Sequence, residues 1–293
     1  MFATLVLSAG LGTRLRPLSL ELPKPLVPIG DAPMLQQIAR QLASYGCERA
    51  VVNTHHLAGE FASRFQNLAV PFQVRNEPEI LGTAGGIRNV ADWLGDGPSL
   101  VWNGDILADI DAELLLAGAD DGQLCLAVAP VVSGSGTVGL DGSGAIVRLR
   151  GEVFGYEVSA ADYVGIVAVG RGCAEALPVQ GCLIGDYCLP LLRSGGRIAT
   201  RSVVRRWRDV GNLYAYLAAN LAWLESRDES YWLGEGASVA SAVELSRVVV
   251  GAGAKIRGSG RVRDCVLWPG SVCEAPLESA VVTPRSGVVP VGE

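Results

Sequence analysis

The chain contains very little lysine, histidine and aromatic residue for its length. Among its 293 residues, aromatic side chains make up 6%, and the lysines and histidines are Lys24, Lys255, His55 and His56. An adjacent pair of histidines is more typical of a loop or a helix start than of a catalytic centre. With no other histidine, we expect neither a triad built on histidine nor a zinc site. The scarcity of lysine makes Lys24 stand out.

Closely spaced cysteine pairs are also missing. The cysteines number seven and are scattered without a CxxC pair, at Cys47, Cys125, Cys173, Cys182, Cys188, Cys265 and Cys273. An odd, dispersed set of this kind predicts buried free thiols in a reducing compartment. We expect a cytoplasmic protein, because the N-terminus carries no charged leader and its apolar run is too short to span a bilayer.

Excess positive charge is absent too. The net charge is −6, while apolar residues make up 49% of the chain. This balance excludes a general nucleic-acid surface, so any cationic site must be local. The length is enough for a large core and suggests one big domain with an appendage, or two modest domains.

The most informative stretch begins with the apolar residues 5–7, which predict a buried strand, and continues into the small residues 8–13. Small residues let backbone N–H groups approach a phosphate closely. Arg14, Arg16 and Lys24 follow and supply three cations, which favours a nucleoside triphosphate as the ligand. The glycine spacing fits neither the dinucleotide-binding fingerprint nor the P-loop.

Strand and helix patterns alternate over the next part of the chain. An amphipathic helix is predicted at 33–45, and strands are predicted at 50–53, 71–74 and 99–102. This alternation predicts a mainly parallel sheet with helices on both faces. Further short strands are predicted at 124–132, 145–149, 164–169 and 198–204, followed by a helix capped by Asn212.

Two loops carry chemistry-bearing residues. Glu77 precedes the glycine-rich residues 81–87, and Asn103-Gly104-Asp105 ends the strand at 99–102. Either segment alone is a common loop or turn pattern. Ligands of open α/β sheets bind at the carboxyl ends of strands, where Asp105 would lie.

A six-residue period appears from about residue 233. Bulky residues recur at Val250, Ile256, Val262 and Trp268, and small or β-branched residues lie four positions after each, at Ala254, Gly260, Val266 and Val272. One bulky and one small inward position in each hexad predicts a short parallel β-helix.

Several of these segments together resemble the sugar-1-phosphate nucleotidyltransferase family. The string from Gly10 to Pro17 (Gly-x-Gly-Thr-Arg-Leu-Arg-Pro) and Pro23-Lys24-Pro25 match its two-part N-terminal motif. Residues 81–86 match its base-reading segment, and Trp207-x-Asp209-Val-Gly matches its second metal motif. The hexads resemble the tails of mannose-1-phosphate and glucose-1-phosphate members.

The resemblance implies roles for particular residues. Arg14, Lys24, Asp105 and Asp209 would be catalytic, and the two aspartates would hold Mg²⁺. Nucleotide binding would fall to Leu7, Ala9, Gly10, Gly12, Thr13, Glu77, Gly82, Thr83 and Ala84, with Glu77 accepting hydrogen bonds from guanine. Sugar-phosphate binding would fall to Asn103, Gly136, Arg150 and Gly165. Many relatives carry a Glu-Lys-Pro lysine for the sugar phosphate, and this lysine is missing here. Either Arg148 or Arg150 replaces it, or the acceptor is held in a different way.

The resemblance implies a Mg²⁺-dependent enzyme that transfers a nucleoside monophosphate from an NTP to a sugar 1-phosphate. GTP with a mannose- or heptose-type acceptor is favoured, UTP with glucose or amino-sugar 1-phosphate is the alternative, and a non-catalytic nucleotide-sugar-binding regulatory subunit is the rival. The expected fold is a Rossmann-like, mixed, mainly parallel sheet at 1–230 with a left-handed parallel β-helix at 231–293. We expect a homo-oligomer formed through this tail.

Overall fold

The computed structural model describes residues 2–62, 68–119 and 122–292. The chain forms two compact units, and each is made of two segments. The first unit comprises Met1–Gly10 and Ile38–Trp207, and the second comprises Leu11–Gln37 and Arg208–Glu293. The unit that contains the C-terminal repeats therefore also contains part of the N-terminal motif, whereas the sequence pattern suggested a cut at residue 230.

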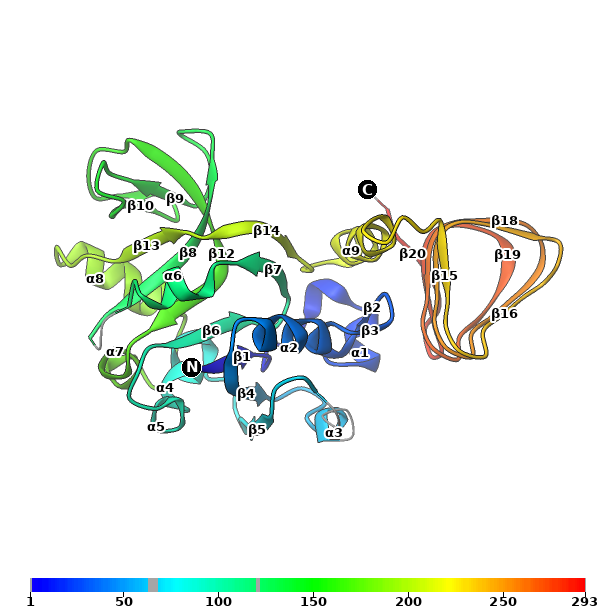
Figure 1. Ribbon diagram of the computed structural model, residues 1–293, viewed down its shortest axis with the longest axis horizontal. Helices are drawn as coiled ribbons and strands as arrows, with labels where there is room; N and C mark the ends of the chain where they lie inside the picture. Colours follow the sequence, from blue (N-terminus) through cyan, green and yellow to red (C-terminus); the bar gives the residue numbers. More distant parts are fainter. Residues whose placement is uncertain (1, 63–67, 120–121, 293) are drawn as a thin grey trace. The chain divides into compact units, whose positions relative to one another are not determined.

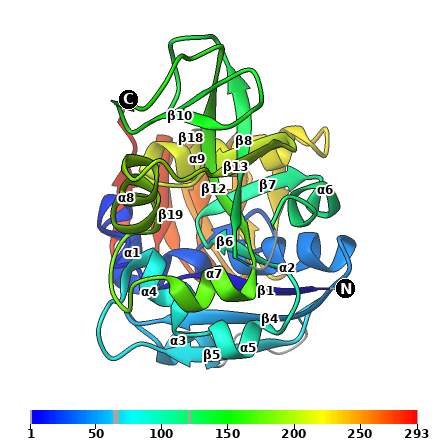
Figure 2. The same ribbon diagram turned by 90° about the vertical axis from the view of Figure 1, so that its left-hand side faces the viewer.

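One half of the main sheet in the first unit is parallel. Strand β1 (Phe2–Leu7) lies between β4 (Cys47–Thr54) and β6 (Ser99–Asn103), and β5 (Phe72–Asn76) pairs with the far side of β4. Figure 2 shows β1, β4 and β5 side by side. These four strands confirm the predicted runs at 5–7, 50–53, 71–74 and 99–102.

The other half of this sheet is mostly antiparallel. Strand β12 (Ser159–Val169) pairs antiparallel with β6, β8 (Leu124–Val131) and β9 (Val138–Leu140). Strands β10 (Ile146–Leu149) and β11 (Glu152–Val153) extend the β9 side, and β13 (Ala199–Ser202) pairs parallel with β8. The sheet is therefore mixed around a parallel core, as predicted.

Both faces of the parallel core are covered. Leu5 and Val101 pack with helix residues such as Ile87 and Leu94 in one cluster. The next residues along these strands, Val6 and Trp102, are also fully buried. Successive side chains of a strand point to opposite faces, so burial at both parities means that both faces are covered.

The helices of the first unit are short. They are α3 (Gly59–Ala62), α4 (Gly82–Arg88), α5 (Ala91–Leu94), α6 (Ala112–Leu116), α7 (Arg171–Ala176), the π-helical turn η3 (Leu183–Cys188) and α8 (Leu189–Arg193). The predicted amphipathic helix is α2 (Met34–Ser44), which buries Leu35, Ile38 and Leu42.

One strand boundary differs from the prediction. The sequence suggested that Arg205–Asp209 would follow a strand, but these residues belong to β14 (Val204–Asp209), which pairs with β7 (Ile106–Ile110). The Arg205 guanidinium lies 3.3 Å from the Asp109 carboxylate of β7. A cross-strand ion pair of this kind favours the extended conformation over a loop.

The second unit begins with short elements and ends in a coil of strands. The first elements are η1 (Thr13–Leu15), α1 (Leu18–Glu21), η2 (Lys24–Leu26), β2 (Pro28–Ile29) and β3 (Ala32–Pro33), and the long helix is α9 (Leu213–Glu225). As predicted, Asn212 caps α9, because its Oδ1 accepts a hydrogen bond of 2.9 Å from the Ala215 N–H.

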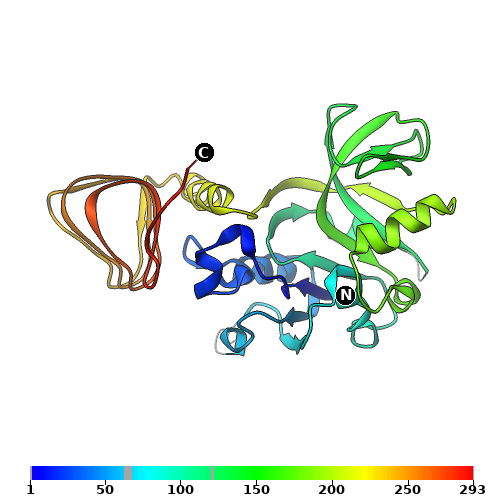
Figure 3. The same cartoon turned by 180° about the vertical axis from the view of Figure 1, so that it is seen from behind.

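The coil consists mainly of parallel strands. They are β15 (Tyr231–Leu233), β16 (Ser238–Val239), β17 (Val243–Val250), β18 (Lys255–Leu267) and β19 (Val272–Thr283), with β20 (Gly287–Pro290) antiparallel to β19. Figures 1 and 3 show these strands as stacked turns. Ser238 pairs beside Lys255, and Lys255 pairs beside Val272, so these three positions align in successive turns.

The bulky hexad positions are confirmed as core, but two of the small positions are not. Val250, Ile256, Val262 and Trp268 are all buried, and so are Ala254 and Val266. Gly260 and Val272 are exposed, so the prediction that they point inward is wrong.

Strand register explains these two exceptions. Val272 pairs beside the exposed Lys255, and the next residue, Cys273, pairs beside the buried Ile256 and takes the inward place. The β18–β19 register shifts between Gly258 and Val262, and Gly260 lies in this interval with a positive φ of 110°.

The N-terminal segment of the second unit packs on α9 and the coil. The Glu21 carboxylate accepts hydrogen bonds from the Thr283 hydroxyl and from the Ser286 N–H (2.8 Å). The Tyr216 hydroxyl donates to the Pro28 carbonyl (2.6 Å) and accepts from the Trp268 indole N–H (2.9 Å). Glu21 and Pro28 of this segment therefore take hydrogen-bond partners from the C-terminal part of the chain.

Two further sequence expectations concern cysteines and membrane spans. All seven cysteines are free thiols, and Cys182 is the one among them that is not fully buried. Within the described ranges, no helix combines the length and apolar character needed to cross a bilayer.

Candidate active site

The end of β1 meets the end of β6 in the first unit. Leu7 pairs beside Asn103, and the Leu7 carbonyl accepts a hydrogen bond of 2.8 Å from the Gly104 N–H. This places Asp105, which is half-buried, directly beyond the carboxyl end of β6 and next to the start of the glycine-rich loop. The predicted position of Asp105 at this edge of the sheet is confirmed by the strand bounds.

Two of the predicted sugar-phosphate residues lie together near this edge. Gly165 has a positive φ of 77°, and a Cβ added to it would lie 2.8 Å from the Asn103 side-chain nitrogen. Any side chain at Gly165 would therefore displace Asn103. The register of β12 against β8 shifts between Tyr163 and Val167, the interval that contains Gly165. Irregular pairing of this kind is common next to active sites, where it changes the direction in which a side chain points.

Gly136 and Arg148 form a structural cluster instead. A Cβ on Gly136 would lie 2.6 Å from the Ala161 carbonyl oxygen, which explains the glycine. The Arg148 guanidinium donates to the Gly136 carbonyl (2.9 Å) and forms an ion pair of 2.7 Å with Glu157. Arg148 also donates to the Ser135 carbonyl (2.9 Å), so its donors already have protein partners.

Arg150 is the more accessible of the two candidate arginines. It is exposed, and its Nη2 lies 3.6 Å from the Cys182 Sγ at the start of η3. Its φ of 49° places it in the left-handed region, which is uncommon for a residue with a side chain. Such positions cluster at functional sites, so the turn at Arg150 is a candidate anion-binding position.

Tyr163 is a residue that the sequence reading did not single out. Burial raises the pKa of its phenol, and the neighbouring Cys188, Cys182 and Asp105 raise it further. Tyr163 is therefore near enough to the predicted metal ligand Asp105 for the charge of that carboxylate to act on its phenol. Its position two residues before Gly165 was the available signal, but a tyrosine in a strand is too common to be informative alone.

The glycines of residues 81–86, the predicted base-reading segment, are required by packing. A Cβ on Gly82 would lie 2.4 Å from the Gly181 carbonyl oxygen, and one on Gly85 would lie 2.5 Å from the Val179 carbonyl oxygen. The loop before η3 therefore lies directly on α4. The Thr83 hydroxyl accepts a hydrogen bond of 2.7 Å from the Leu183 N–H, which fastens the two segments together.

The side chains of this segment are less open than the sequence suggested. Ala84 is fully buried, and its N–H donates to the Gly181 carbonyl (2.9 Å). Glu77 is 1% exposed, and its carboxylate accepts from the Asn53 amide (2.8 Å) and from the Leu81 N–H (3.2 Å). The expectation that Glu77 meets guanine is therefore corrected, because its carboxylate is enclosed and already hydrogen-bonded within the protein.

The glycine-rich loop opens toward solvent. Ala9 is buried, but Gly10 is exposed and has no atom within 4 Å of the position that a Cβ would take. Gly12 has the left-handed φ of 61°, and its carbonyl accepts from the Ser19 hydroxyl (2.8 Å). The exposed Thr13 begins η1 directly after it. The burial of Ala9 and the hydrogen bond from Ser19 to Gly12 therefore fix the loop, while Gly10 and Thr13 remain exposed.

The second unit brings Arg14 next to Asp209. The Arg14 Nη1 and the Asp209 Oδ1 lie 3.1 Å and 3.0 Å from the position of a Cβ on Gly211. Lys24 is half-buried in η2, between Pro23 and Pro25, and its Cβ lies 3.5 Å from the Cβ position of Gly12. The two predicted cations therefore come from short, fixed turns.

The carboxylates suit a hard cation. Asp105 is half-buried and lies two residues beyond the end of β6, and Asp209 is exposed and is the last residue of β14. Among the residues that the structure describes, no group of three or more His, Cys, Asp or Glu side chains could hold a metal by itself. Mg²⁺ commonly binds through one or two carboxylates together with water and substrate phosphates. The carboxylate of each unit, Asp105 in the first and Asp209 in the second, is therefore of the ligand type that this ion prefers.

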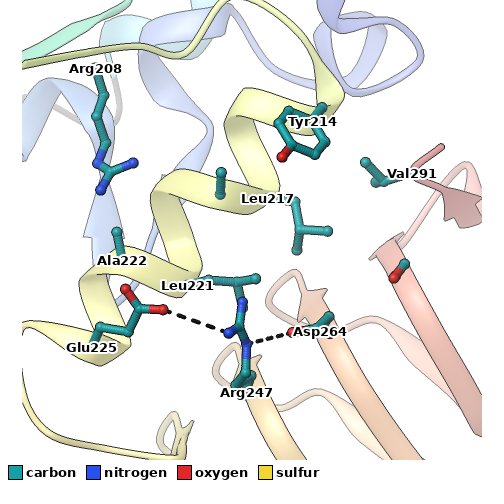
Figure 4. A pocket seen from close by; sticks show the side chains of 11 residues that line it. Arg208, Tyr214, Leu217, Leu221, Ala222, Glu225, Arg247, Asp264 and Val291 are labelled. Carbon is teal, nitrogen blue, oxygen red and sulfur yellow. Dashed lines mark ion pairs between the residues drawn. The ribbon is translucent and has the colours of Figure 1, made fainter. Parts of the chain in front are cut away.

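A pocket of about 390 Å³ lies between α9 and one corner of the coil (Figure 4). Its charged lining residues are Arg208, Glu225, Arg247 and Asp264. The Arg247 guanidinium contacts Asp264 (2.6 Å) and Glu225 (3.7 Å). The formal charges of the two arginines and the two carboxylates sum to zero, and none of the predicted site residues lines the pocket.

Comparison with known proteins gives the following similarities. The sequence profile of the Nucleotidyl transferase family matches residues 3–149. A mannose-1-phosphate guanylyltransferase of Mycobacterium tuberculosis is 38% identical over 114 residues, which is 38% of this chain. The chain spans about a third (32%) of that relative's length. An N-acetylmuramate alpha-1-phosphate uridylyltransferase of Caulobacter vibrioides is 29% identical over 76% of this chain and 97% of its own.

A solved structure shares the fold. HddC from Yersinia pseudotuberculosis, complexed with GMP-PN, superposes with a TM-score of 0.65 at 23% identity, over 76% of this chain and 100% of its own. The profile match covers half of the chain and includes the glycine-rich loop, Lys24, the base-reading segment and Asp105. On these grounds, the chain belongs to the Nucleotidyl transferase family.

Proposed function

We propose that this protein transfers a nucleoside monophosphate from an NTP to a sugar 1-phosphate, with release of pyrophosphate. The observation that carries the proposal is the position of Asp105 in a chain of this family. It lies at the carboxyl end of β6, beside the loop that follows β1 and beside the Asn103–Gly165 contact. Ligands of open α/β sheets bind at this edge, so a carboxylate here is placed to hold a substrate-bound cation.

The reaction needs no protein nucleophile. An oxygen of the sugar phosphate attacks the α-phosphorus of the NTP in line, the P–O bond to the β-phosphate breaks, and pyrophosphate leaves with the electron pair. The residues then contribute by positioning and by neutralising charge. Arg14 would bind the β- and γ-phosphates, and Lys24 would contact the α-phosphate. Asp105 and Asp209 would hold Mg²⁺, which would supply positive charge to the phosphate oxygens.

We favour GTP as the nucleotide and a mannose- or heptose-type sugar 1-phosphate as the acceptor. The relative from Mycobacterium tuberculosis is a mannose-1-phosphate guanylyltransferase, and HddC was solved in complex with GMP-PN. The relative from Caulobacter vibrioides is a uridylyltransferase, which keeps UTP as the alternative.

Arg150 is our candidate for the missing lysine at the sugar phosphate. Arg148 is already held by Glu157 and by two backbone carbonyls, whereas Arg150 is exposed. A guanidinium can bind two phosphate oxygens at once, so it can replace a lysine chemically.

We assign residues 1–230 to the nucleotidyltransferase region and 231–293 to a left-handed parallel β-helix. The register of β16, β18 and β19 and the inward hexad residues support a coil. Exposed apolar residues on this coil, including Tyr231, Leu233 and Val288, support its use as a surface for homo-oligomer formation.

The test is pyrophosphate release with Mg²⁺ from each of GTP, UTP, ATP, CTP and dTTP, paired with mannose, heptose, glucose and N-acetylhexosamine 1-phosphates. We expect one pairing to dominate and Asp105→Asn to reduce its turnover by about a hundredfold or more. The control is Asp92→Asn, which changes an exposed aspartate of α5. Silence in every pairing, with nucleotide sugars still raising the melting temperature, would favour the regulatory subunit instead.

A further inference from the structure

A buried amide–carboxylate pair joins two segments that are far apart in the sequence. Asn53 lies near the end of β4, and Glu77 follows the end of the neighbouring strand β5. They are 2% and 1% exposed, and the Asn53 Nδ2 donates to the Glu77 Oε1 at 2.8 Å. The Glu77 backbone is fixed as well, since its N–H donates to the Thr54 carbonyl (2.7 Å).

Each end of this pair holds a backbone N–H group. The Ser8 N–H donates to the Asn53 Oδ1 at 2.7 Å, and the Leu81 N–H donates to the Glu77 Oε2 at 3.2 Å. Ser8 is the first residue after β1 and begins the glycine-rich loop. Leu81 directly precedes Gly82 and the rest of α4. The chain of hydrogen bonds therefore runs from the glycine-rich loop, which is the predicted phosphate-binding loop, to residues 81–86, the predicted base-reading segment.

Helix α4 also packs directly on the pair. A Cβ on Gly86 would lie 2.8 Å from the Asn53 Nδ2 and 3.3 Å from the Glu77 Oε1. Only a glycine lets the helix approach this closely. Gly86 is thus explained by the Asn53–Glu77 pair, and the helix position depends on the pair being intact.

The pair has a fixed polarity. Buried polar groups are costly unless every donor meets an acceptor, so only one arrangement of donors and acceptors satisfies the chain of bonds. The amide must turn its oxygen to Ser8 and its NH₂ to Glu77, and both carboxylate oxygens must accept. Neither side chain is open to a ligand, so any effect on a substrate must act through the two backbone segments.

We propose that Asn53 and Glu77 are positioning residues that hold the phosphate-binding loop and the base-reading segment in one relative position, and thereby set the affinity and selectivity for the NTP. The inference rests on the proposed nucleotidyl transfer. It assigns Glu77 an indirect role in nucleotide recognition in place of direct contact with the base.

The polarity of the pair allows a test with matched variants. In Glu77→Gln, the introduced NH₂ would face either the Asn53 NH₂ or the Leu81 N–H, and neither of these donors can accept a hydrogen bond. In Asn53→Asp, two carboxylates would face each other. In the double variant Asn53→Asp/Glu77→Gln, the introduced glutamine donates its amide to the introduced aspartate, while the Ser8 and Leu81 N–H groups each still meet an oxygen. The double variant keeps the charge and all three hydrogen bonds.

The measurements are KM for the NTP, KM for the sugar 1-phosphate, kcat, and the Kd of the preferred NTP by calorimetry without acceptor. We expect each single variant to raise KM and Kd for the NTP by about 10- to 100-fold, the scale expected when buried donors and acceptors are mispaired. KM for the sugar phosphate should change less than about threefold. The double variant should restore all values to within about threefold, and Glu79→Gln, which removes an exposed carboxylate two residues away, should have no effect.

Several results would overturn the proposal. One is a lower melting temperature of the single variants with an unchanged KM for the NTP, because the pair would then stabilise the fold without affecting nucleotide binding. Another is a folded double variant that still binds the NTP weakly. If a single variant fails to fold, the double variant against wild type decides the question. If the wild-type protein releases no pyrophosphate in any substrate pairing, the proposed function itself is rejected. This outcome differs from a failure of the positioning role, in which the wild type is active.

Discussion

Cys182 differs from the other six cysteines in both exposure and protonation. Burial alone would raise the pKa of its thiol, but the N–H groups of Gly185 and Ile184, together with Arg150 and Thr83, lower it below the usual value. Burial raises the pKa of every other cysteine, to about 11 for Cys125 and about 12 for Cys188 and Cys265.

We expect iodoacetamide at pH ~7.5 to alkylate Cys182 at least about tenfold faster than any other cysteine, because the thiolate is the reacting species. Peptide mapping by mass spectrometry over time measures this directly. Arg150→Ala should slow the labelling, since removing the cation raises the thiol pKa and reduces the thiolate fraction. Equal labelling of a second cysteine in the folded protein would contradict the assigned environment.

Individual site residues were predictable where a strand end or a motif fixed them. Asp105 could be placed from the apolar run before it and the turn residues around it. The role of Glu77 could not, because its partners Asn53 and Leu81 are set by the pairing of β4 with β5. The same holds for Arg148, whose partner Glu157 lies in the loop between β11 and β12.

The contact between α1 and the end of β19 depends on one buried carboxylate. Burial raises the pKa of Glu21, but hydrogen bonds from Ser286 and Thr283 and the N–H of Arg285 outweigh this, so the pKa in the folded state is below the usual 4.5. A carboxylate with a lowered pKa in the folded state stabilises the fold at pH values above its unfolded-state pKa. This stabilisation is lost as the pH falls through the folded-state pKa.

Glu21→Gln should therefore lower the free energy of unfolding by about 2 kcal/mol at pH ~7, the scale of hydrogen bonds to a charged group. The difference from wild type should shrink as the pH falls below about 4.5 toward ~3. Urea titrations at several pH values measure this. Glu235→Gln, at an exposed position, is the control, and a pH-independent difference would show that the carboxylate charge is not responsible.

Elements with strong periodicity were predicted well, and those governed by pairing were not. Strands β1, β4, β5 and β6 and helix α2 follow their apolar patterns closely. Strand β14 was missed because its charged residues follow no alternation and are held by pairing with β7. The hexad pattern failed at Gly260, where a register shift between neighbouring strands interrupts the six-residue period.

At the scale of the whole molecule, the C-terminal coil is more than an appended tail. Residues 11–37, which carry Arg14 and Lys24, share a compact unit with α9 and the coil. Their contacts include the Glu21 hydrogen bonds and the link from Pro28 through Tyr216 to Trp268. Sequence patterns could not reveal this sharing, because it depends on contacts between residues as far apart in the chain as Pro28 and Tyr216.

Deletion of residues 231–293 should therefore abolish nucleotidyl transfer although Arg14, Lys24, Asp105 and Asp209 are all retained. The deletion would expose apolar residues of α9 such as Leu221 and would leave Glu21 without its donors. Pyrophosphate release and the melting temperature of the shortened chain measure the effect. A folded product with wild-type turnover would show that residues 11–37 do not need the coil.

The division of the chain into two interleaved units also determines how its parts can be exchanged. A chimera that grafts the coil of a relative onto this protein at a single junction would separate Glu21 and Pro28 from the partners with which they are packed. A graft designed with three junctions, near residues 10, 37 and 207, would move each unit whole. Residues 11–37, which carry Arg14 and Lys24, should therefore evolve together with the coil, so that substitutions in one constrain substitutions in the other.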